Sequence, residues 1–217
     1  RENYTYRQSV RIQELDADGN PRGKYEIVSD IIFAGDNKRT ERVIRAPVST
    51  LQNILLTPED EQDLRNVQPF VLTTNEIGQY DIRYLGKQKV DEIPCYMFSV
   101  KPRAMEKGKR YFEGEIWVDD RDLQIVKTYG KGVGILKKGS DNQFPKFETY
   151  REQIDGKYWF PTYTTANDTL RFQTGPQRIK MTVKYENYKQ FKSDVNITFG
   201  DEVEKDKTPA PAAPPKK

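Results

Sequence analysis

The fold class is decided by the stretch Arg110-Tyr111-Phe112-Glu113-Gly114-Glu115-Ile116-Trp117-Val118. Its aliphatic and phenylalanine side chains fall on every second position, and glutamates occupy most of the positions between them. A period of two is typical of a strand with one buried face and one face in water. Asp119-Asp120-Arg121-Asp122 then turns the chain into the next apolar run, which predicts an antiparallel neighbour.

The same alternation recurs on both sides of this stretch. The runs that carry it are 4–12, 24–34, 38–45, 79–85, 94–100, 110–118, 123–129, 146–154, 158–166 and 178–188. Short turns between consecutive runs require antiparallel pairing, because a parallel crossover needs about a dozen residues or more. We therefore predict a mainly β protein with one wide, curled antiparallel sheet, an unclosed β-barrel of about eleven strands.

Helix signals lie within residues 49–67. Thr57-Pro58-Glu59-Asp60 offers a hydroxyl N-cap, a proline at the first helical position and acids in the first turn, which predicts a short helix over 58–67. A second short helix is expected over 49–55, where Leu51, Ile54 and Leu55 would share one side. One or two short helices would then cover the concave face of the sheet.

The composition excludes several kinds of chemistry. The 217 residues include no histidine and one cysteine, Cys95, and the net charge is +3. Triads that use histidine, imidazole metal ligands, intramolecular disulfides and cysteine-rich zinc sites are therefore excluded. A calcium loop beginning at Asp16 would need a glutamate at its twelfth position, where Ile27 stands. We predict no cofactor, no metal site and no enzymatic activity.

The domain organisation follows from a change in composition near residue 200. Residues 1–199 are predicted to form one half-barrel domain, and 200–217 a flexible charged and Pro/Ala/Lys-rich tail. The chain begins at Arg1 close to a strand pattern, so we expect an upstream segment, such as a secretory signal. No apolar run approaches the roughly 20 residues that span a bilayer, so no transmembrane segment is predicted.

A glycine-rich stretch, Gly130-Lys131-Gly132-Val133-Gly134, resembles a phosphate loop but lacks the Lys-Ser/Thr that would follow. We interpret it as a mobile loop at the rim of the sheet. Cys95 follows Pro94 within a strand pattern and is predicted to be a small buried thiol.

The aromatic and branched face of the strands is the most informative feature. A wide curled sheet with few helices has little material to fill its concave side, so part of this face is expected to line a ligand cavity. The residues predicted to line it are Val10, Ile12, Tyr96, Phe98, Phe112, Ile116, Val118, Met181 and Val183.

Several stretches resemble the outer-membrane lipoprotein-sorting, or LolA-like, superfamily. They are Tyr84-Leu85-Gly86-Lys87, Val90-Asp91, Cys95-Tyr96, Val100-Lys101-Pro102, Tyr111-Phe112-Glu113-Gly114-Glu115-Ile116-Trp117-Val118-Asp119, Ile125-Val126-Lys127 and Trp159-Phe160-Pro161-Thr162. The resemblance implies an unclosed barrel of about eleven strands with helices over its mouth. It also implies a periplasmic protein of the bacterial envelope that binds acyl chains of lipids or lipoproteins. Such a protein would act as carrier or sensor in lipoprotein sorting, with an outer- or inner-membrane protein as a further partner; no nucleic acid is expected.

Two alternative functions stay open at this point. The first is an envelope protein-interaction module whose core is filled by its own side chains, with Tyr111, Trp117 and Trp159 as an exposed aromatic patch. The second is a carboxylate-dependent hydrolase that uses Glu113, Glu115 or Asp119.

Overall fold

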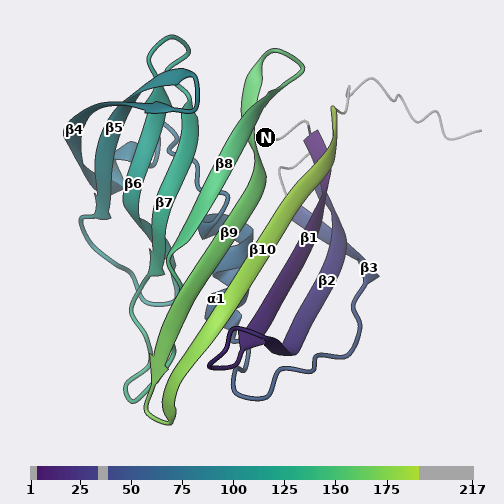
Figure 1. Ribbon diagram of the computed structural model, residues 1–217. Coiled ribbons are helices and arrows are strands. Elements are labelled where there is room, and N and C mark those ends of the chain that lie inside the picture. Colours follow the sequence, from purple (N-terminus) through teal and green to yellow (C-terminus); the bar gives the residue numbers. More distant parts are fainter. Residues whose placement is uncertain (1–3, 34–38, 191–217) are drawn as a thin grey trace, which may run out of the picture.

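The computed structural model describes residues 4–33 and 39–190, which form one ten-stranded antiparallel sheet in the order β3-β2-β1-β10-β9-β8-β7-β6-β5-β4 (Figure 1). The strands are β1 (Tyr4–Leu15), β2 (Pro21–Phe33), β3 (Arg39–Arg45), β4 (Tyr80–Val90), β5 (Ile93–Pro102), β6 (Tyr111–Asp119), β7 (Ile125–Val133), β8 (Phe147–Ile154), β9 (Tyr158–Phe172) and β10 (Gly175–Gln190). The mainly β, unclosed architecture is confirmed, with ten strands in the described residues instead of about eleven. The predicted domain boundary at 199/200 and the tail lie outside these residues.

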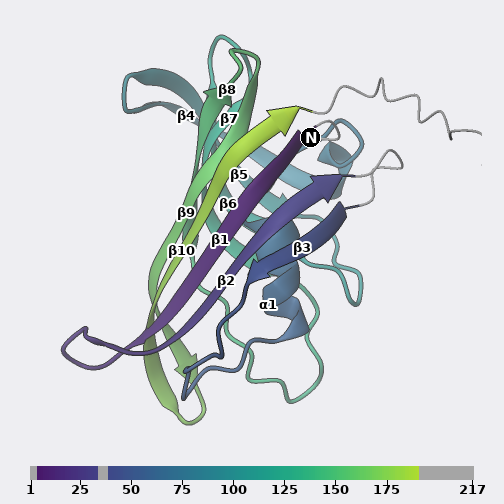
Figure 2. The ribbon, with the colours of Figure 1, turned by 90° about the vertical axis from the view of Figure 1, so that its right-hand side faces the viewer.

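The sheet curls around a single helical segment, which lies against its concave face (Figure 2). This segment consists of α1 (Pro58–Gln62) and a π-helical turn, η1 (Asp63–Val67), so the helix predicted over 58–67 is confirmed. It begins at a capping box, in which Thr57 and Asp60 exchange side-chain and backbone hydrogen bonds. A short 3₁₀ turn, η2 (Ile77–Gln79), leads into β4.

The prediction of a helix over 49–55 is wrong, because a carboxylate on a strand accepts hydrogen bonds from the backbone N–H groups of this segment. Glu14 on β1 is 1% exposed and accepts hydrogen bonds from the N–H groups of Gln52 (2.9 Å), Asn53 (2.7 Å) and Ile54 (2.7 Å). Consecutive amides that converge on one anion form a backbone nest instead of a helical turn. Residues 49–57 are therefore an extended loop pinned to β1.

The main core lies between the concave face and the helical segment. The register pairs Val10 with Val183 and Ile12 with Met181, so apolar side chains from β1 and β10 lie side by side. The members of this core that are at least nine-tenths buried are Val10, Ile12, Leu64, Val67, Phe70, Tyr80, Val100, Tyr111, Phe112, Ile116, Phe147, Ala166, Met181, Val183 and Tyr185. A smaller cluster of Cys95, Trp117 and Val126 packs apart from it, and burial raises the pKa of the Cys95 thiol.

The mobile glycine loop predicted at 130–134 is also wrong for most of its length, because Gly130 and Gly132 lie inside β7 and are buried. A Cβ on Gly130 would overlap the Glu113 carbonyl of β6, and a Cβ on Gly132 would overlap the Asp63 carboxylate. These glycines permit close packing of the neighbouring strand and of the helical segment.

Candidate binding site

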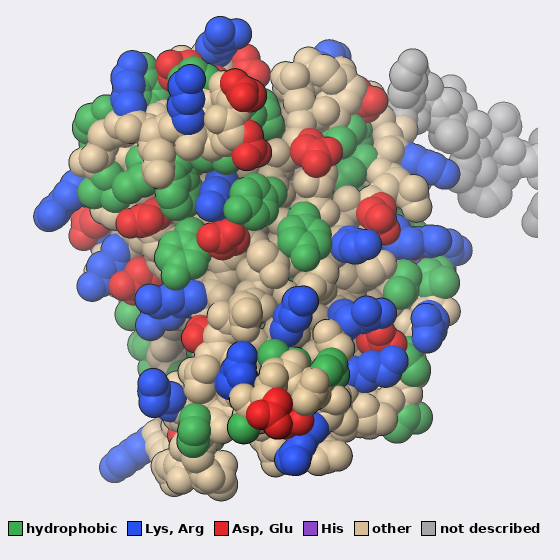
Figure 3. Space-filling model, viewed as in Figure 1, with side chains coloured by type: hydrophobic (Ala, Val, Ile, Leu, Met, Phe, Trp, Pro, Cys, Tyr) green, Lys and Arg blue, Asp and Glu red, His purple; other side chains and the backbone are tan. Residues whose placement is uncertain are grey.

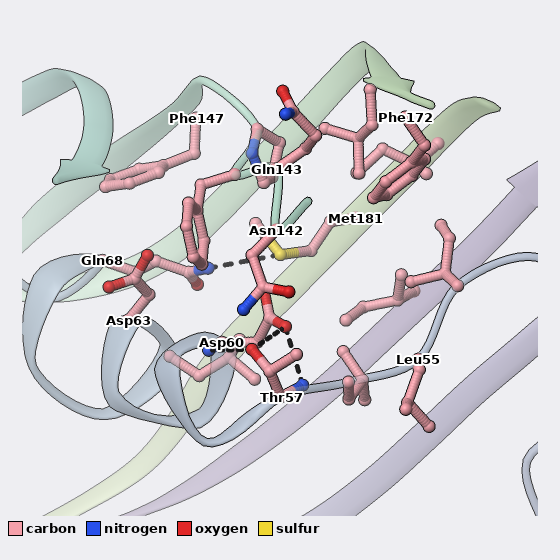
Figure 4. A pocket seen from close by; sticks show the side chains of 18 residues that line it. Leu55, Thr57, Asp60, Asp63, Gln68, Asn142, Gln143, Phe147, Phe172 and Met181 are labelled. Atoms are coloured by element: carbon pink, nitrogen blue, oxygen red, sulfur yellow. Dashed lines mark hydrogen bonds between the residues drawn. The ribbon is translucent and has the colours of Figure 1, made fainter. Parts of the chain in front are cut away.

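A small cavity lies between the concave face and the segments that cover it. It has a volume of about 50 Å³. β1, β8, β9 and β10 form the sheet side, while residues 54–64 and 142–145 lie opposite (Figure 4). The apolar lining residues are Ile12, Ile54, Leu55, Leu56, Leu64, Phe144, Pro145, Phe147, Leu170, Phe172, Ile179 and Met181.

Leu55 marks the mouth of this cavity. Its side chain belongs to the lining, yet the residue is 85% exposed. Leu55 therefore presents apolar surface to solvent beside the apolar lining, and burial of that surface against a ligand would be favourable. The loop that carries Leu55 is the same one that Glu14 holds, so the mouth is bounded by a segment with little secondary structure of its own.

The polar side of the cavity begins at the capping box of α1. The Thr57 hydroxyl and the Thr57 N–H donate to the Asp60 carboxylate at 2.7 and 2.8 Å (Figure 4). Burial raises the pKa of Asp60 above its ordinary value and outweighs these hydrogen bonds. The carboxylate is committed to holding the start of the helix.

Asp63 and Arg110 form a buried ion pair deeper in the site. Arg110 Nε donates to one Asp63 oxygen at 2.8 Å and Arg110 Nη2 to the other at 2.6 Å, with the two side chains 3% and 9% exposed. Burial raises the pKa of Asp63 to about 6, although Arg110 favours the charged form. The centroid of the Phe144 ring lies 3.8 Å from the Arg110 guanidinium carbon, so the ring covers the guanidinium in a cation–π contact.

Few polar contacts join the helical segment and the chain after it to the sheet. Gln8 donates to the Leu64 carbonyl at 3.3 Å, and Thr149 donates to the Gln68 carbonyl at 2.8 Å. The Gln68 amide reaches the Met181 sulfur at 3.3 Å, as Figure 4 shows. Arg151 donates to the carbonyl of Phe70. Arg65 of η1 also lies 3.6 Å from Glu41 on β3, and Asp63 pairs with Arg110 just before β6. Beyond these contacts the segment is attached by apolar packing, which has no directional preference.

A second hollow lies on the other side of the helical segment. It is an open groove of about 700 Å³ bordered by Val67, Phe70, Tyr80, Tyr111 and Phe112, together with polar residues. The cavity touches residues 60, 63 and 64 of the segment, whereas the groove touches 62, 66 and 67. The helical segment therefore separates two hollows over one sheet face.

The structure divides the predicted lining residues among several places. Ile12 and Met181 line the cavity and Phe112 borders the groove, whereas Val10, Ile116 and Val183 are core residues. Phe98 and Val118 pack against that core, and Tyr96 lies by Tyr84 and Lys87 at the edge of the sheet. Their role in ligand binding stays a prediction.

Sequence reasoning missed most of the cavity lining. Ile54-Leu55-Leu56 is an apolar triplet flanked by polar residues, which was a usable signal, and Ile179 follows the alternation of Met181 and Val183. Phe144 and Pro145 come from a stretch with no regular pattern, so only the tertiary structure brings them to the site.

The residues named for the alternative functions have other surroundings. Trp117 and Tyr111 are 7% and 5% exposed, so they cannot form the exposed patch that we predicted with Trp159. Trp117 packs in the smaller cluster with Cys95 and Val126, and Tyr111 packs in the main core, so both rings are buried instead of exposed. Asp119 accepts the Arg121 N–H at 2.8 Å and so holds the turn after β6.

No protein-family model matches the chain, and no curated protein matches it. Among solved structures it is similar to a DUF1329 family protein from Desulfovibrio piger, at 13% identity over 91% of this chain and 88% of that one, with a TM-score of 0.41. It is also similar to a LolA superfamily protein from Nitrosomonas europaea (12%, 88% and 86%, TM-score 0.38). A third is the Pseudomonas aeruginosa complex of MucA and MucB (13%, 87% and 94%, TM-score 0.23). LolA superfamily proteins are thus among its structural neighbours, and these distant likenesses assign no role to any residue.

Within residues 4–33 and 39–190, no helix has the length and apolar character needed to cross a membrane.

Proposed function

We propose that this chain is a non-enzymatic periplasmic protein that binds an acyl chain of a lipid or lipoprotein beneath the cover formed by residues 49–70. It would act as a carrier or sensor in outer-membrane lipoprotein sorting. The observation that carries the proposal is the apolar cavity with exposed Leu55 at its mouth. An apolar lining recognises methylenes without a strong polar contact, at roughly 0.8 kcal/mol for each one buried.

The volume sets a condition on this function. A cavity of about 50 Å³ holds roughly three to five waters, whereas ligand pockets typically enclose about 300–1,000 Å³. An acyl chain therefore enters only when the cover moves away from the sheet. Displacement of the helical segment would join the cavity to the groove beyond it, and the bound state is a population shift rather than a reaction.

A second candidate function is a protein-interaction module with a filled core. The small volume of the cavity favours it, as does the complete burial of Phe112 and Phe147 in the concave face. The two candidates make opposite predictions for acyl-chain binding, so one experiment separates them.

The test is native mass spectrometry of the delipidated chain with palmitate. We expect one palmitate adduct on the wild type and at least a tenfold weaker adduct on Leu55→Asp, because a carboxylate at the mouth must be desolvated against the acyl chain. Val48→Asp is the matched control: Val48 is 92% exposed in the neighbouring stretch and is not a lining residue, so it should keep the adduct. No adduct on the wild type, or equal loss in both variants, overturns the proposal.

A further inference from the structure

The convex face carries a groove that the concave site does not use. It has a volume of about 390 Å³ and crosses β10, β1 and β2 toward the end of β3. Its basic lining residues are Arg11, Arg45, Lys180 and Lys184, and its acidic ones are Glu26 and Glu186. Figure 3, which looks onto this face, shows lysine and arginine side chains over the whole face, β10, β1 and β2 included, with acidic side chains among them, and hydrophobic side chains gathered over β4–β7.

Two acids of β2 on this face are each paired with two cations. Glu26 lies 2.7 Å from Arg11 and 3.2 Å from Lys24. Asp30, further along β2, lies 2.8 Å from both Arg7 and Arg42. The hydrogen bonds from these two arginines hold the pKa of Asp30 at about 2. Glu26 and Asp30 thus each contact two cations, whereas Glu186 has no ion pair within 4.0 Å among the described residues. The groove lining itself holds four basic and two acidic side chains and so carries excess positive charge.

The basic side chains of the groove that have no ion pair within the described part of the chain are available to an anionic ligand. Lys180, Lys184 and Arg45 have no ion-pair partner within 4.0 Å among the described residues. Lys180 and Lys184 flank Thr182 on β10, and Thr182 pairs with Arg11 on β1, so three cations border one short stretch of sheet. Like charges held together favour an extended anionic partner.

The rim of the groove distinguishes among anionic partners. Ile44 and Val48, adjoining Arg45 and Pro47, are 47% and 92% exposed. The lining itself has no aromatic residue, whereas single-stranded nucleic acids stack on aromatic platforms and protein hot spots favour Trp and Tyr. Cations beside exposed aliphatic side chains suit the headgroup region of a bilayer, where charge and apolar area act together.

We propose that this basic groove, with its aliphatic rim, docks the protein on an anionic lipid bilayer surface. This proposal is independent of acyl-chain binding, because the groove lies on the opposite face of the sheet. Docking would hold the molecule at a membrane by electrostatic attraction that falls as salt rises.

The test is co-sedimentation with phosphatidylglycerol–phosphatidylcholine vesicles at physiological ionic strength, with pure phosphatidylcholine vesicles alongside. We expect binding to the anionic vesicles only. The triple variant Arg45→Gln/Lys180→Gln/Lys184→Gln should bind about a hundredfold more weakly, from roughly fivefold for each cation lost near the surface. Lys137→Gln/Lys138→Gln/Lys157→Gln removes equal charge from exposed positions outside the groove and should keep wild-type binding.

Three results would overturn the proposal. They are equal loss in both triple variants, competition by free glycerol phosphate, and tighter binding to an oligonucleotide or polyglutamate than to anionic vesicles. Thermal unfolding of the variants establishes that each is folded. The palmitate adduct of the groove variant should match that of the wild type, so failure here and failure of acyl-chain binding are separate outcomes.

Discussion

Two consecutive segments cover the concave face, and they reach their conformations by different routes. Residues 58–67 are helical because a local capping box and a proline at the first position begin the helix. The apolar residues of 49–57 have helical spacing. The segment nevertheless forms a loop, because the Glu14 carboxylate accepts hydrogen bonds from three of its backbone N–H groups. One segment is fixed by its neighbours in sequence and the other by a strand about forty residues earlier. The loop can therefore be released while the helix stays formed.

The largest expected effect comes from removing the anchor of the loop. Glu14→Ala leaves three amides without their acceptor, and we expect the free energy of unfolding to fall by about 3–5 kcal/mol. Urea denaturation measures the loss, and Gln13→Ala, the next residue on the opposite face of β1, is the control. A loss below about 1 kcal/mol would contradict the anchoring role of Glu14.

A smaller effect, dependent on pH, is expected at the helical segment. The pKa of Asp63 rises from 3.8 to about 6 in the folded state because burial disfavours its charge. Between these two pH values the folded state therefore binds more protons than the unfolded state. The contribution of protonated Asp63 to the free energy of unfolding is fully present below pH 3.8 and is lost as pH rises through about 6.

Asp63→Asn should abolish this dependence. From about pH 4 to about pH 7, we expect the wild type to lose about 2–3 kcal/mol of unfolding free energy relative to the variant. Urea denaturation across this range tests it. Parallel pH profiles, or a wild type that gains stability relative to Asp63→Asn as pH rises, would show that burial does not dominate at Asp63.

Much of the fold was predictable because alternation records which strand face is buried. The alternation of Phe112, Ile116 and Val118 is reproduced on one face of β6, and the short turns give the antiparallel order. Gly130 and Gly132 could not be placed in a strand from their own sequence. A side chain at Gly130 would overlap the backbone of β6, and one at Gly132 would overlap the Asp63 carboxylate. Only the tertiary structure brings these groups close to the two glycines.

The candidate site was less predictable, because polar residues build part of it. Gln8 and Glu14 continue the inward alternation of Val10 and Ile12, but side chains of this type ordinarily indicate a solvent face. Both are buried and both hold the cover, Gln8 through Leu64 and Glu14 through the loop. A polar residue in register with an apolar strand face is thus a signal for an anchored loop or helix.

The most direct test of acyl-chain binding beneath the cover is amide hydrogen exchange of the delipidated chain with and without palmitate. Entry of the acyl chain requires the loop to leave Glu14. We therefore predict faster exchange at Gln52, Asn53 and Ile54 in the complex, while the amides that pair β1 with β10 stay protected. Unchanged exchange throughout residues 49–70 in the presence of palmitate would contradict the account.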